Sequence, residues 1–544
     1  MNMMDTPLTI THILKRARDI FPKNEIVSRL SDGIFRYTYK DMYDRTLRLS
    51  GAMADLGVGR GDKVATLAWN DHRHLEAYFA MPVMGAIVHT VNIRLSPEHI
   101  IYILNHAEDK VLLFDESLLP LVEGIHTHLQ AVKAFVMLTE KTISELPATA
   151  IKPLYAYEEL IANRDADFPL PDDIGENEPC GMCYTSATTG QPKGVIYTHR
   201  ALFLHSMASG LADTLALSEK DVILPFVPMF HVNAWGIPYS STLFGSKQVL
   251  PGPAPTPQVL LELYEKERVT VSAGVPTIWL GVLQMLDQFP GKYDTSSIRG
   301  LITGGAAAPK GMIKAFKERH NLAILHAYGM TETTPLALAS RLKPRLEANL
   351  SDDEKLDYAA AQGLLVPGLE MKLVNEQGVV PWDGKTMGEL CFRGPWIAGE
   401  YYRDERSKST FVDGWLHTGD VATINEEGYV RIVDRTKDLV KSGGEWISSV
   451  DLENALMAHP AVLEAAVIGV PHPKWQERPL AFVVLKDAQK GKVTKAEILD
   501  FIAPQFAKWW LPDDLLFIDA IPKTTVGKFL KRSLREDYQH HFIQ

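Results

Sequence analysis

The sequence has few cysteines, no long apolar run and no excess of positive charge, and each lack excludes a class of protein. Three cysteines in 544 residues are too few for a disulfide framework and are typical of a reducing cytosol. No run of about 18 apolar residues could span a membrane, and residues 1–21 lack the apolar core of a signal peptide. We therefore expect a cytoplasmic protein. A net charge of −11 argues against nucleic-acid binding, which needs a basic face.

Two of the cysteines, Cys180 and Cys183, form a C-x-x-C pair, but this pair does not predict a zinc site. Such a site needs two further ligands, and the sequence offers no second pair at a suitable spacing. On a strand, the odd spacing also places the two thiols on opposite faces. We expect neither a metal-binding nor a redox role for them.

The apolar residues fall into short strand-like runs that alternate with helical segments. Residues 64–68 precede a helical run at 72–83, and residues 222–226 precede another at 257–266. Such alternation predicts an α/β fold with mostly parallel sheets. The length of 544 residues exceeds what one hydrophobic core usually supports, so at least two domains are expected.

The pattern changes near the C-terminal end. A charged run at residues 434–438 interrupts an apolar region, and later segments, such as 450–458 and 465–469, carry helix and strand patterns of their own. They are enough for a small α+β domain, so we expect a domain boundary near Lys437. The charged and polar residues 340–361 predict a surface insertion.

Residues 184–194 are the most informative segment of the chain. Hydroxyls, glycines and one lysine lie between two apolar runs, which predicts a loop between two strands. Hydroxyls, backbone N–H groups and an ammonium group suit a polyphosphate. The common phosphate loop has Gly-Lys-Ser/Thr leading into a helix, whereas here Lys193 precedes Gly194. The alternative is a polar hairpin tip without a ligand.

Five other segments carry groups that suit nucleotide chemistry. Residues 328–332 combine an aromatic ring, a hydroxyl and a carboxylate that is a ready magnesium ligand. The others are residues 415–420, which end in an aspartate, the cationic run 434–438, the glycine-containing run 441–445 and the basic run 522–528. Each segment alone is more often a turn or a solvated surface.

Taken together and in this order, the six segments resemble those of the adenylate-forming acyl-CoA synthetases. This family is related to luciferases and to the adenylation domains of peptide synthetases. The resemblance extends from about residue 35 to residue 534, nearly the whole chain.

The resemblance implies two domains and a two-step reaction. A large AMP- and acyl-binding domain with mostly parallel sheets would cover residues 1–434, and a small mobile α+β lid would cover residues 438–544, with a hinge at 435–437. A carboxylic acid would react with ATP to give acyl-AMP and pyrophosphate, and the acyl group would then pass to coenzyme A with release of AMP. ATP, Mg²⁺ and coenzyme A are thus implied. Relatives are often dimers, so a homodimer is expected.

The same resemblance assigns nucleotide contacts to individual residues. Glu332 and Thr188 would hold Mg²⁺, and Thr331 would touch the α-phosphate. Asp420 and Arg435 would bind the ribose hydroxyls. The β- and γ-phosphates are expected at Thr185, Ser186, Thr188, Thr189 and Lys193, and adenine at Gly304, Gly305, Ala306, Ala307 and Tyr328.

Three lysines receive roles in the reaction from the resemblance. Lys528 would be the catalytic lysine of adenylation, where a cation offsets the repulsion between two anionic reactants. Lys437 would be the hinge about which the small domain turns between the two steps. That turn would bring Lys441, Gly443 and Gly444 to the pantetheine arm of coenzyme A.

One position departs from the family pattern. Ala187 stands where the phosphate loop of the family usually has glycine, and alanine is costly wherever a positive φ is required. The hydroxyls and Lys193 are retained, so we expect a small change in loop mobility and no loss of ATP binding.

The acyl pocket is expected around residues 230–235, with His231 and Trp235, and at Pro335. Amino-acid-activating relatives usually have an aspartate where His231 stands, so an amino acid is not the expected substrate. Trp235 would fill the pocket and limit chain length, which predicts a short or medium apolar acid. The sequence resembles most the branch with 3-methylmercaptopropionate–CoA ligases and medium-chain fatty-acid ligases, and we favour 3-methylmercaptopropionate.

Three alternatives have different consequences. A luciferase-like oxidase of an acyl-adenylate would consume oxygen. An enzyme that loads a carrier protein would need a basic docking face, which the sequence does not show. A binding module without catalysis would release no pyrophosphate with any acid.

Overall fold

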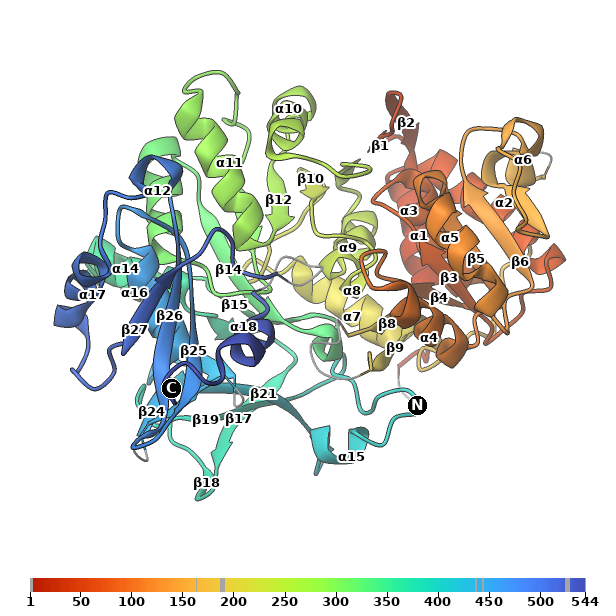
Figure 1. The fold of residues 1–544 in the computed structure, drawn as a ribbon. Helices are drawn as coiled ribbons and strands as arrows, with labels where there is room; N and C mark the ends of the chain where they lie inside the picture. Colours follow the sequence, from red (N-terminus) through yellow and green to blue (C-terminus); the bar gives the residue numbers. More distant parts are fainter. Residues whose placement is uncertain are drawn as a thin grey trace.

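The computed structural model describes residues 3–162, 164–185, 191–435, 438–442, 445–523 and 529–543. Within these residues the strands form four sheets, two mainly parallel and two mainly antiparallel. Figure 1 shows the two mainly parallel sheets side by side, with the C-terminal part of the chain packed against the second of them. This arrangement confirms the predicted α/β fold with an additional small domain.

The first sheet has the strand order β7-β6-β5-β3-β4-β8-β9 and is parallel except for β9 at its edge. Its core strands, such as β3 and β5, are apolar and buried on both faces, as parallel strands between helices must be. The bounds are β3 (Lys63–Leu67), β4 (Ile87–Thr90), β5 (Val111–Asp115), β6 (Ala134–Leu138), β7 (Leu154–Ala156), β8 (Pro179–Tyr184) and β9 (Gly194–Thr198).

The second sheet has the order β16-β15-β14-β13-β12-β10-β11-β1-β2. Its six central strands, from β14 to β1, run parallel, and antiparallel strands close both edges. The bounds are β1 (Glu25–Arg29), β2 (Ile34–Thr38), β10 (Val222–Pro225), β11 (Lys247–Leu250), β12 (Val271–Gly274), β13 (Gly300–Thr303), β14 (Ile324–Gly329), β15 (Leu336–Ala339) and β16 (Leu364–Leu365).

Helices fill the space between these two sheets and cover their outer faces (Figure 1). Helices α1 (Ile10–Ile20), α2 (Tyr39–Asp55), α3 (His72–Val83), α7 (His199–Ser209) and α9 (Ile237–Phe244) pack on one another near the centre. Helix α3 is buried along its whole length, and its polar side chains are paired: Arg73 donates to Glu158, and Glu76 accepts from Arg45. These pairs remove the cost of burying single charges.

The outer helices explain the apolar periodicity of the sequence. Helices α10 (Pro257–Glu267), α11 (Pro276–Gln288) and α12 (Lys310–His320) contribute to a separate core against the second sheet, and α4 (Pro97–Ala107) and α5 (Leu119–Ile125) to one against the first. The predicted insertion forms α13 (Pro344–Asn349) and α14 (Asp352–Ala360). Ser351 caps α14 in a capping box with Glu354.

The third sheet is antiparallel. It contains β17 (Glu370–Asn375), β18 (Gly378–Val379), β19 (Gly388–Arg393), β20 (Phe411–Val412), β21 (Trp415–Ile424) and β22 (Val430–Arg435). Two of the predicted polar segments therefore lie on strands, where register fixes the direction of their side chains.

The fourth sheet belongs to the small C-terminal unit. It contains β23 (Val440–Ser442), β24 (Glu445–Ile447), β25 (Val462–His472), β26 (Gln476–Leu485) and β27 (Asp514–Phe517), with helices α16 (Ser449–Met457), α17 (Lys495–Ile502) and α18 (Lys531–Tyr538). The segment 441–445 was expected as a flexible loop, but Lys441 and Ser442 pair in register with β24. The boundary near Lys437 stays a prediction, because residues 436 and 437 lie outside the described residues.

Two expectations about the whole chain can be compared with the structure. The three cysteines are buried free thiols, as expected of a chain without a disulfide framework. None of the helices in the described ranges is both long and apolar enough to cross a membrane.

Candidate functional site

A cavity of about 720 Å³ lies where strands of the second sheet end. Residues that follow β13 and β14 form its floor, and the hairpin of β8 and β9 and the third sheet form its walls. The carboxyl ends of parallel strands are where open α/β sheets bind ligands. The cavity collects these residues predicted from the sequence: Thr185, Lys193, His231, Trp235, Gly304, Gly305, Tyr328, Thr331, Glu332, Pro335 and Arg435.

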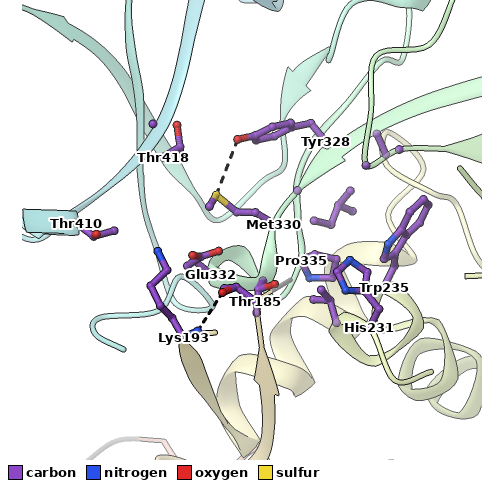
Figure 2. Close-up of a pocket in the computed structure, with 18 of the residues that line it drawn as sticks. Thr185, Lys193, His231, Trp235, Tyr328, Met330, Glu332, Pro335, Thr410 and Thr418 are labelled. Carbon is purple, nitrogen blue, oxygen red and sulfur yellow. Dashed lines mark hydrogen bonds between the residues drawn. The ribbon is translucent and has the colours of Figure 1, made fainter. Parts of the chain in front are cut away.

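The predicted phosphate loop is the tip of the β8–β9 hairpin. The Thr185 N–H donates to the Lys193 carbonyl at 2.9 Å, and the Lys193 N–H donates to Thr185 Oγ1 at 3.1 Å. These bonds hold the two ends of the loop together at the cavity (Figure 2). Ser186, Thr188 and Thr189 lie outside the described residues, as does Ala187.

A buried network connects the loop lysine with the predicted magnesium ligand. Lys193 Nζ donates to Tyr401 Oη at 2.8 Å, and Tyr401 Oη donates to Glu332 Oε1 at 2.5 Å. The Lys193 ammonium also lies 4.1 Å from the centre of the Tyr401 ring. Burial and the neighbouring Glu332 carboxylate raise the pKa of Tyr401, so its hydroxyl keeps the proton that it donates.

Glu332 and Thr331 lie on a short 3₁₀ helix, Thr331–Thr333, directly after β14. Tyr197 Oη donates to the Thr331 carbonyl at 2.9 Å, and the Ala398 N–H donates to the Glu332 carbonyl at 2.8 Å. Both side chains are almost fully buried. The backbone bonds therefore fix the direction of a hydroxyl and a carboxylate toward the cavity.

The end of the cavity where the nucleoside is predicted contains Tyr328 and Arg435, and both contact Asp420, which lines an adjoining cavity. Tyr328 Oη donates to Asp420 Oδ2 at 2.6 Å, and Arg435 Nε lies 3.1 Å from Asp420 Oδ1. The Asp420 carboxylate raises the pKa of Arg435. A β-bulge in the pairing of β21 with β22 lies beside Asp420, and bulges of this kind re-aim side chains next to active sites.

Small residues leave room for a flat ligand beside Tyr328. A Cβ at Gly304 would lie 2.7 Å from the Ala327 carbonyl oxygen, and Gly305 has a φ of +78°, which favours glycine. Ala306 lines an adjoining cavity of about 320 Å³ between β14 and the helices α16 and α18, together with Asp420, Tyr328 and Ala307.

The end of the cavity predicted to bind the acyl group is mostly apolar and is shaped by an unusual backbone. Residues 232–235 all have φ between +44° and +59°, and Gly236 follows at +73°, so this turn is left-handed. Non-glycine residues adopt that conformation at a cost of about 1–2 kcal/mol each. Figure 2 shows His231, Trp235 and Pro335 together on one side of the cavity. The Trp235 ring lies 3.2 Å from the position of a Cβ on Gly304.

The described part of the chain does not bring every predicted residue to the main cavity. Lys441, on β23, is not among the residues that line it. Gly443, Gly444, Lys437 and Lys528 lie outside the described residues. Their roles therefore stay predictions.

The sequence-based reasoning missed several residues of the cavity wall, and three of them make polar contacts that matter here: Tyr401, Glu389 and His417. His417 Nδ1 lies 2.9 Å from Glu389 Oε2, and the Gly419 N–H donates to Glu389 Oε1 at 2.9 Å. His417 belonged to a segment already singled out, so its position three residues before Asp420 was an available signal. Tyr401 carried no comparable local signal.

Comparison with family models identifies two regions. The AMP-binding enzyme model matches residues 14–402, and the model of the AMP-binding enzyme C-terminal domain matches residues 451–528.

Curated relatives match over nearly their full length. The chain is 52% identical to the long-chain-fatty-acid–CoA ligase of Thermus thermophilus, over 99% of this chain and 97% of the relative. It is 42% identical to the medium-chain-fatty-acid–CoA ligase of Ectopseudomonas oleovorans, over 98% and 97%. It is also 42% identical to the 3-methylmercaptopropionyl-CoA ligase of Ruegeria pomeroyi, over 99% and 98%.

Solved structures agree with these matches. An anthranilate CoA ligase in complex with anthranoyl-AMP has a TM-score of 0.87 at 26% identity, covering 99% of both chains. ATP-bound MatB from Rhodopseudomonas palustris has a TM-score of 0.82 at 26% identity, covering 98% of this chain and all of that chain.

Proposed function

The chain belongs to the AMP-binding enzyme family and is an acid–thiol ligase that makes acyl-CoA through an acyl-adenylate, and on this premise we propose which acid it uses and how. The substrate is a short- or medium-chain apolar carboxylic acid, with 3-methylmercaptopropionate as the specific candidate. The observation that carries this choice is the Trp235 ring, packed against Gly304 across the apolar end of the cavity.

The apolar end supports an uncharged acyl chain. Besides Trp235 it offers the side chains Leu215, Val232, Ile302 and Leu336, and no carboxylate among its described residues stands where an α-ammonium group would need one. A thioether resembles a methylene in size, and an apolar pocket separates substrates by only about 1–3 kcal/mol per methylene. Several acids should therefore be accepted, with a maximum where the chain just reaches Trp235.

The phosphate end supports the assignment of ATP. Thr185 and Lys193 bind the β- and γ-phosphates together with Ser186, Thr188 and Thr189. The nucleoside lies along Tyr328 and Gly304–Gly305, with the ribose hydroxyls at Asp420 and Arg435. Asp420 accepts from Tyr328 and pairs with Arg435, and these contacts hold its carboxylate in place as an acceptor for those hydroxyls.

The donor set at Glu332 fits Mg²⁺, a hard cation that prefers oxygen ligands and keeps several waters. The Glu332 carboxylate lies at the cavity, with Tyr401 Oη bound to one of its oxygens, and Thr188 adds a hydroxyl from the loop. When bound, Mg²⁺ neutralises phosphate charge.

The protein's part in the first step is positioning and charge stabilisation. A substrate carboxylate oxygen attacks the α-phosphorus, and the bond from that phosphorus to the pyrophosphate oxygen breaks. Thr331 holds the α-phosphate and Lys528 stands between the two anions, where one such contact contributes about 3–4 kcal/mol. In the second step the CoA sulfur attacks the acyl carbonyl, the carbon–oxygen bond to AMP breaks so that AMP leaves, and the thiol proton goes to solvent. A turn about Lys437 would first bring Lys441, Gly443 and Gly444 to the pantetheine arm.

The two steps can be separated by mutation. Lys528→Ala should lose pyrophosphate release but still convert supplied acyl-adenylate to thioester. Lys437→Pro should keep adenylation and lose thioester formation. An equal loss in both steps with Lys528→Ala would contradict its assignment, and unchanged thioester formation with Lys437→Pro would contradict the hinge.

The acid itself is tested by pyrophosphate release with ATP, Mg²⁺ and CoA across straight-chain acids from acetate to palmitate, 3-methylmercaptopropionate and benzoate. We expect the maximum of kcat/KM at 3-methylmercaptopropionate or at four to eight carbons, and a shift to longer chains in Trp235→Ala. The second candidate, a long-chain fatty acid, is favoured by the relative that is 52% identical. A wild-type maximum at palmitate would establish it and refute the Trp235 limit.

Two further expectations accompany the proposal. A homodimer would appear as twice the mass of 60.6 kDa in sedimentation. A cytosolic location would appear on fractionation of the source cells.

A further inference from the structure

Three potential metal ligands converge on one wall of the cavity. Glu389 and Cys391 lie on β19, and His417 lies on the neighbouring strand β21. His417 Nδ1 is 2.9 Å from Glu389 Oε2 and 3.6 Å from Cys391 Sγ. One ligand atom from each residue lies within 4.8 Å of the other two.

The strand register explains why the three side chains meet. Glu389 and Cys391 are two residues apart, so they point to the same face of β19. Cys391 is the direct cross-strand partner of His417, and the pairing shifts register between Glu389 and Cys391. Gly419, with a φ of +73°, lies in that irregular stretch, and its N–H fixes Glu389 Oε1 at 2.9 Å. The cluster is thus held by backbone geometry on both strands.

Two potential ligand atoms converge on His417 Nδ1. Its single hydrogen is shared between the Glu389 carboxylate and the Cys391 sulfur, and the Cys391 thiol also donates to the Glu389 carbonyl at 3.7 Å. A cation in place of that hydrogen would bind all three atoms. Tetrahedral Zn²⁺, with ligand distances of about 2.0–2.3 Å, separates its N, O and S ligands by roughly 3.3–3.6 Å. The distances from Nδ1 to the carboxylate oxygen, 2.9 Å, and to the sulfur, 3.6 Å, are close to these separations.

We propose that Glu389, Cys391 and His417 form a binding site for a thiophilic divalent cation of the Zn²⁺ class, with its fourth coordination position facing the cavity. Glu389 and His417 line the cavity, which gives the cation an entry path and leaves room for a water. Binding breaks the Cys391 S–H bond and forms the metal–sulfur bond, with the proton going to solvent. The proton on His417 Nδ1 moves to Nε2 by exchange with solvent, so the imidazole stays neutral and Nδ1 is free to bind the cation. One thiolate and one carboxylate then balance the double positive charge.

The ligand atoms distinguish this proposed site from the proposed Mg²⁺ site and from a second cluster of potential ligands. Mg²⁺ prefers oxygen ligands and does not select thiolate, so Mg²⁺–ATP should not compete for it. A second cluster, His72 with Glu140 and Glu158, already pairs with the guanidinium groups of Arg73 and, at Glu158, Arg45. These guanidinium groups already neutralise the carboxylates that a metal ion would need as ligands.

A cation here would lie at the cavity wall that Thr418 also lines, on the side of Tyr328 (Figure 2). Given the proposed ATP site, it should oppose nucleotide binding, so Zn²⁺ should inhibit adenylation. The metal site itself does not depend on that function, because binding can be measured without turnover.

The experiment is a Co²⁺ titration of the metal-free full-length protein, monitored by thiolate-to-metal charge-transfer absorption. We expect one saturable site with that absorption in the wild type. Cys391→Ser should lose the absorption and weaken Co²⁺ binding about 100-fold or more, since even a lost supporting contact around a metal costs 10–100-fold. The matched control is Cys180→Ala, which removes another buried thiol and should leave the absorption unchanged.

Two other measurements extend the test. His417→Gln should lower Co²⁺ affinity while Cys391 is still present, which provides a second variant if Cys391→Ser does not fold. Zn²⁺ inhibition of pyrophosphate release at fixed Mg²⁺–ATP should disappear in Cys391→Ser. Absence of the absorption in the wild type, or its persistence in Cys391→Ser, would overturn the site. Zn²⁺ inhibition that is equal in both proteins would overturn its link to the nucleotide.

Discussion

The two ends of the main cavity are built by different means. At the phosphate end, Lys193, Tyr401 and Glu332 are joined by side-chain hydrogen bonds of 2.8 and 2.5 Å. At the acyl end, the left-handed backbone of residues 232–236 shapes an apolar wall. We therefore expect the loss of a single polar atom to lower activity at the phosphate end. At the acyl end, a change in backbone freedom or packing should lower stability.

The largest effect is expected from Glu332→Gln at the phosphate end. The amide keeps the size of the side chain but loses the charge that attracts Mg²⁺, so kcat/KM for pyrophosphate release should fall about 10²–10³-fold. Half-saturation with Mg²⁺ should rise. Glu318→Gln, on the exposed face of α12, is the control and should keep wild-type values. An unchanged Mg²⁺ dependence in Glu332→Gln would show that the phosphate end is not sensitive to the loss of this single charged group.

Gly236→Ala tests the acyl end through packing. A Cβ at this position would lie 2.6 Å from His205 Cε1, and the residue has a φ of +73°. Overpacking costs typically 1–3 kcal/mol and the left-handed conformation about 1–2 kcal/mol more, so the free energy of unfolding should fall by roughly 2–5 kcal/mol. The measurement is the urea-unfolding midpoint.

Gly311→Ala supplies the matched comparison for that measurement. Gly311 lies within α12, and a Cβ there meets nothing within 4 Å. Alanine should stabilise the helix by about 0.5–1 kcal/mol. Equal destabilisation by the two substitutions would show that the acyl-end backbone is no more constrained than an ordinary helix.

Tyr401→Phe removes the hydroxyl between Lys193 and Glu332. A hydrogen bond to a charged group contributes about 1.5–3 kcal/mol, so kcat/KM should fall about 10–100-fold, with a rise in KM for ATP. Tyr402→Phe is the control, because that ring packs against His106 at the adjacent position. If Tyr401→Phe had the same kcat/KM and the same KM for ATP as Tyr402→Phe, the Tyr401 hydroxyl would make no contribution to catalysis or ATP binding.

The same contrast explains what could be predicted from the sequence. The β8–β9 hairpin and Glu332 followed from local patterns: hydroxyls and glycines between two apolar strands, and a carboxylate just after one. The Tyr401–Glu332 hydrogen bond joins residues 69 positions apart, and no local sequence pattern predicts it. The left-handed turn was equally hidden, because four of its five residues are not glycine. Cys391 meets His417 only because of a register shift, which tertiary pairing decides.

The smallest expected effect concerns pH and lies directly beneath the acyl-end turn. His205 is fully buried, its Nε2 accepts the Leu336 N–H at 3.2 Å, and burial lowers its pKa to about 3. Between pH 3 and about 6.5, the usual histidine pKa, the unfolded chain binds more protons at this residue. Its contribution to stability is therefore complete above pH 6.5 and is lost as pH falls toward 3.

His205→Gln should retain an acceptor for the Leu336 N–H but cannot titrate. On going from pH 7.5 to 5.5, wild type should lose about 1 kcal/mol more unfolding free energy than this variant, since one pH unit below the unfolded pKa corresponds to about 1.4 kcal/mol. Exposed His128→Gln should follow the wild type. If all three proteins lost stability equally, His205 would be protonated in the folded chain, and the acyl-end wall would tolerate a buried charge that its apolar packing is expected to exclude.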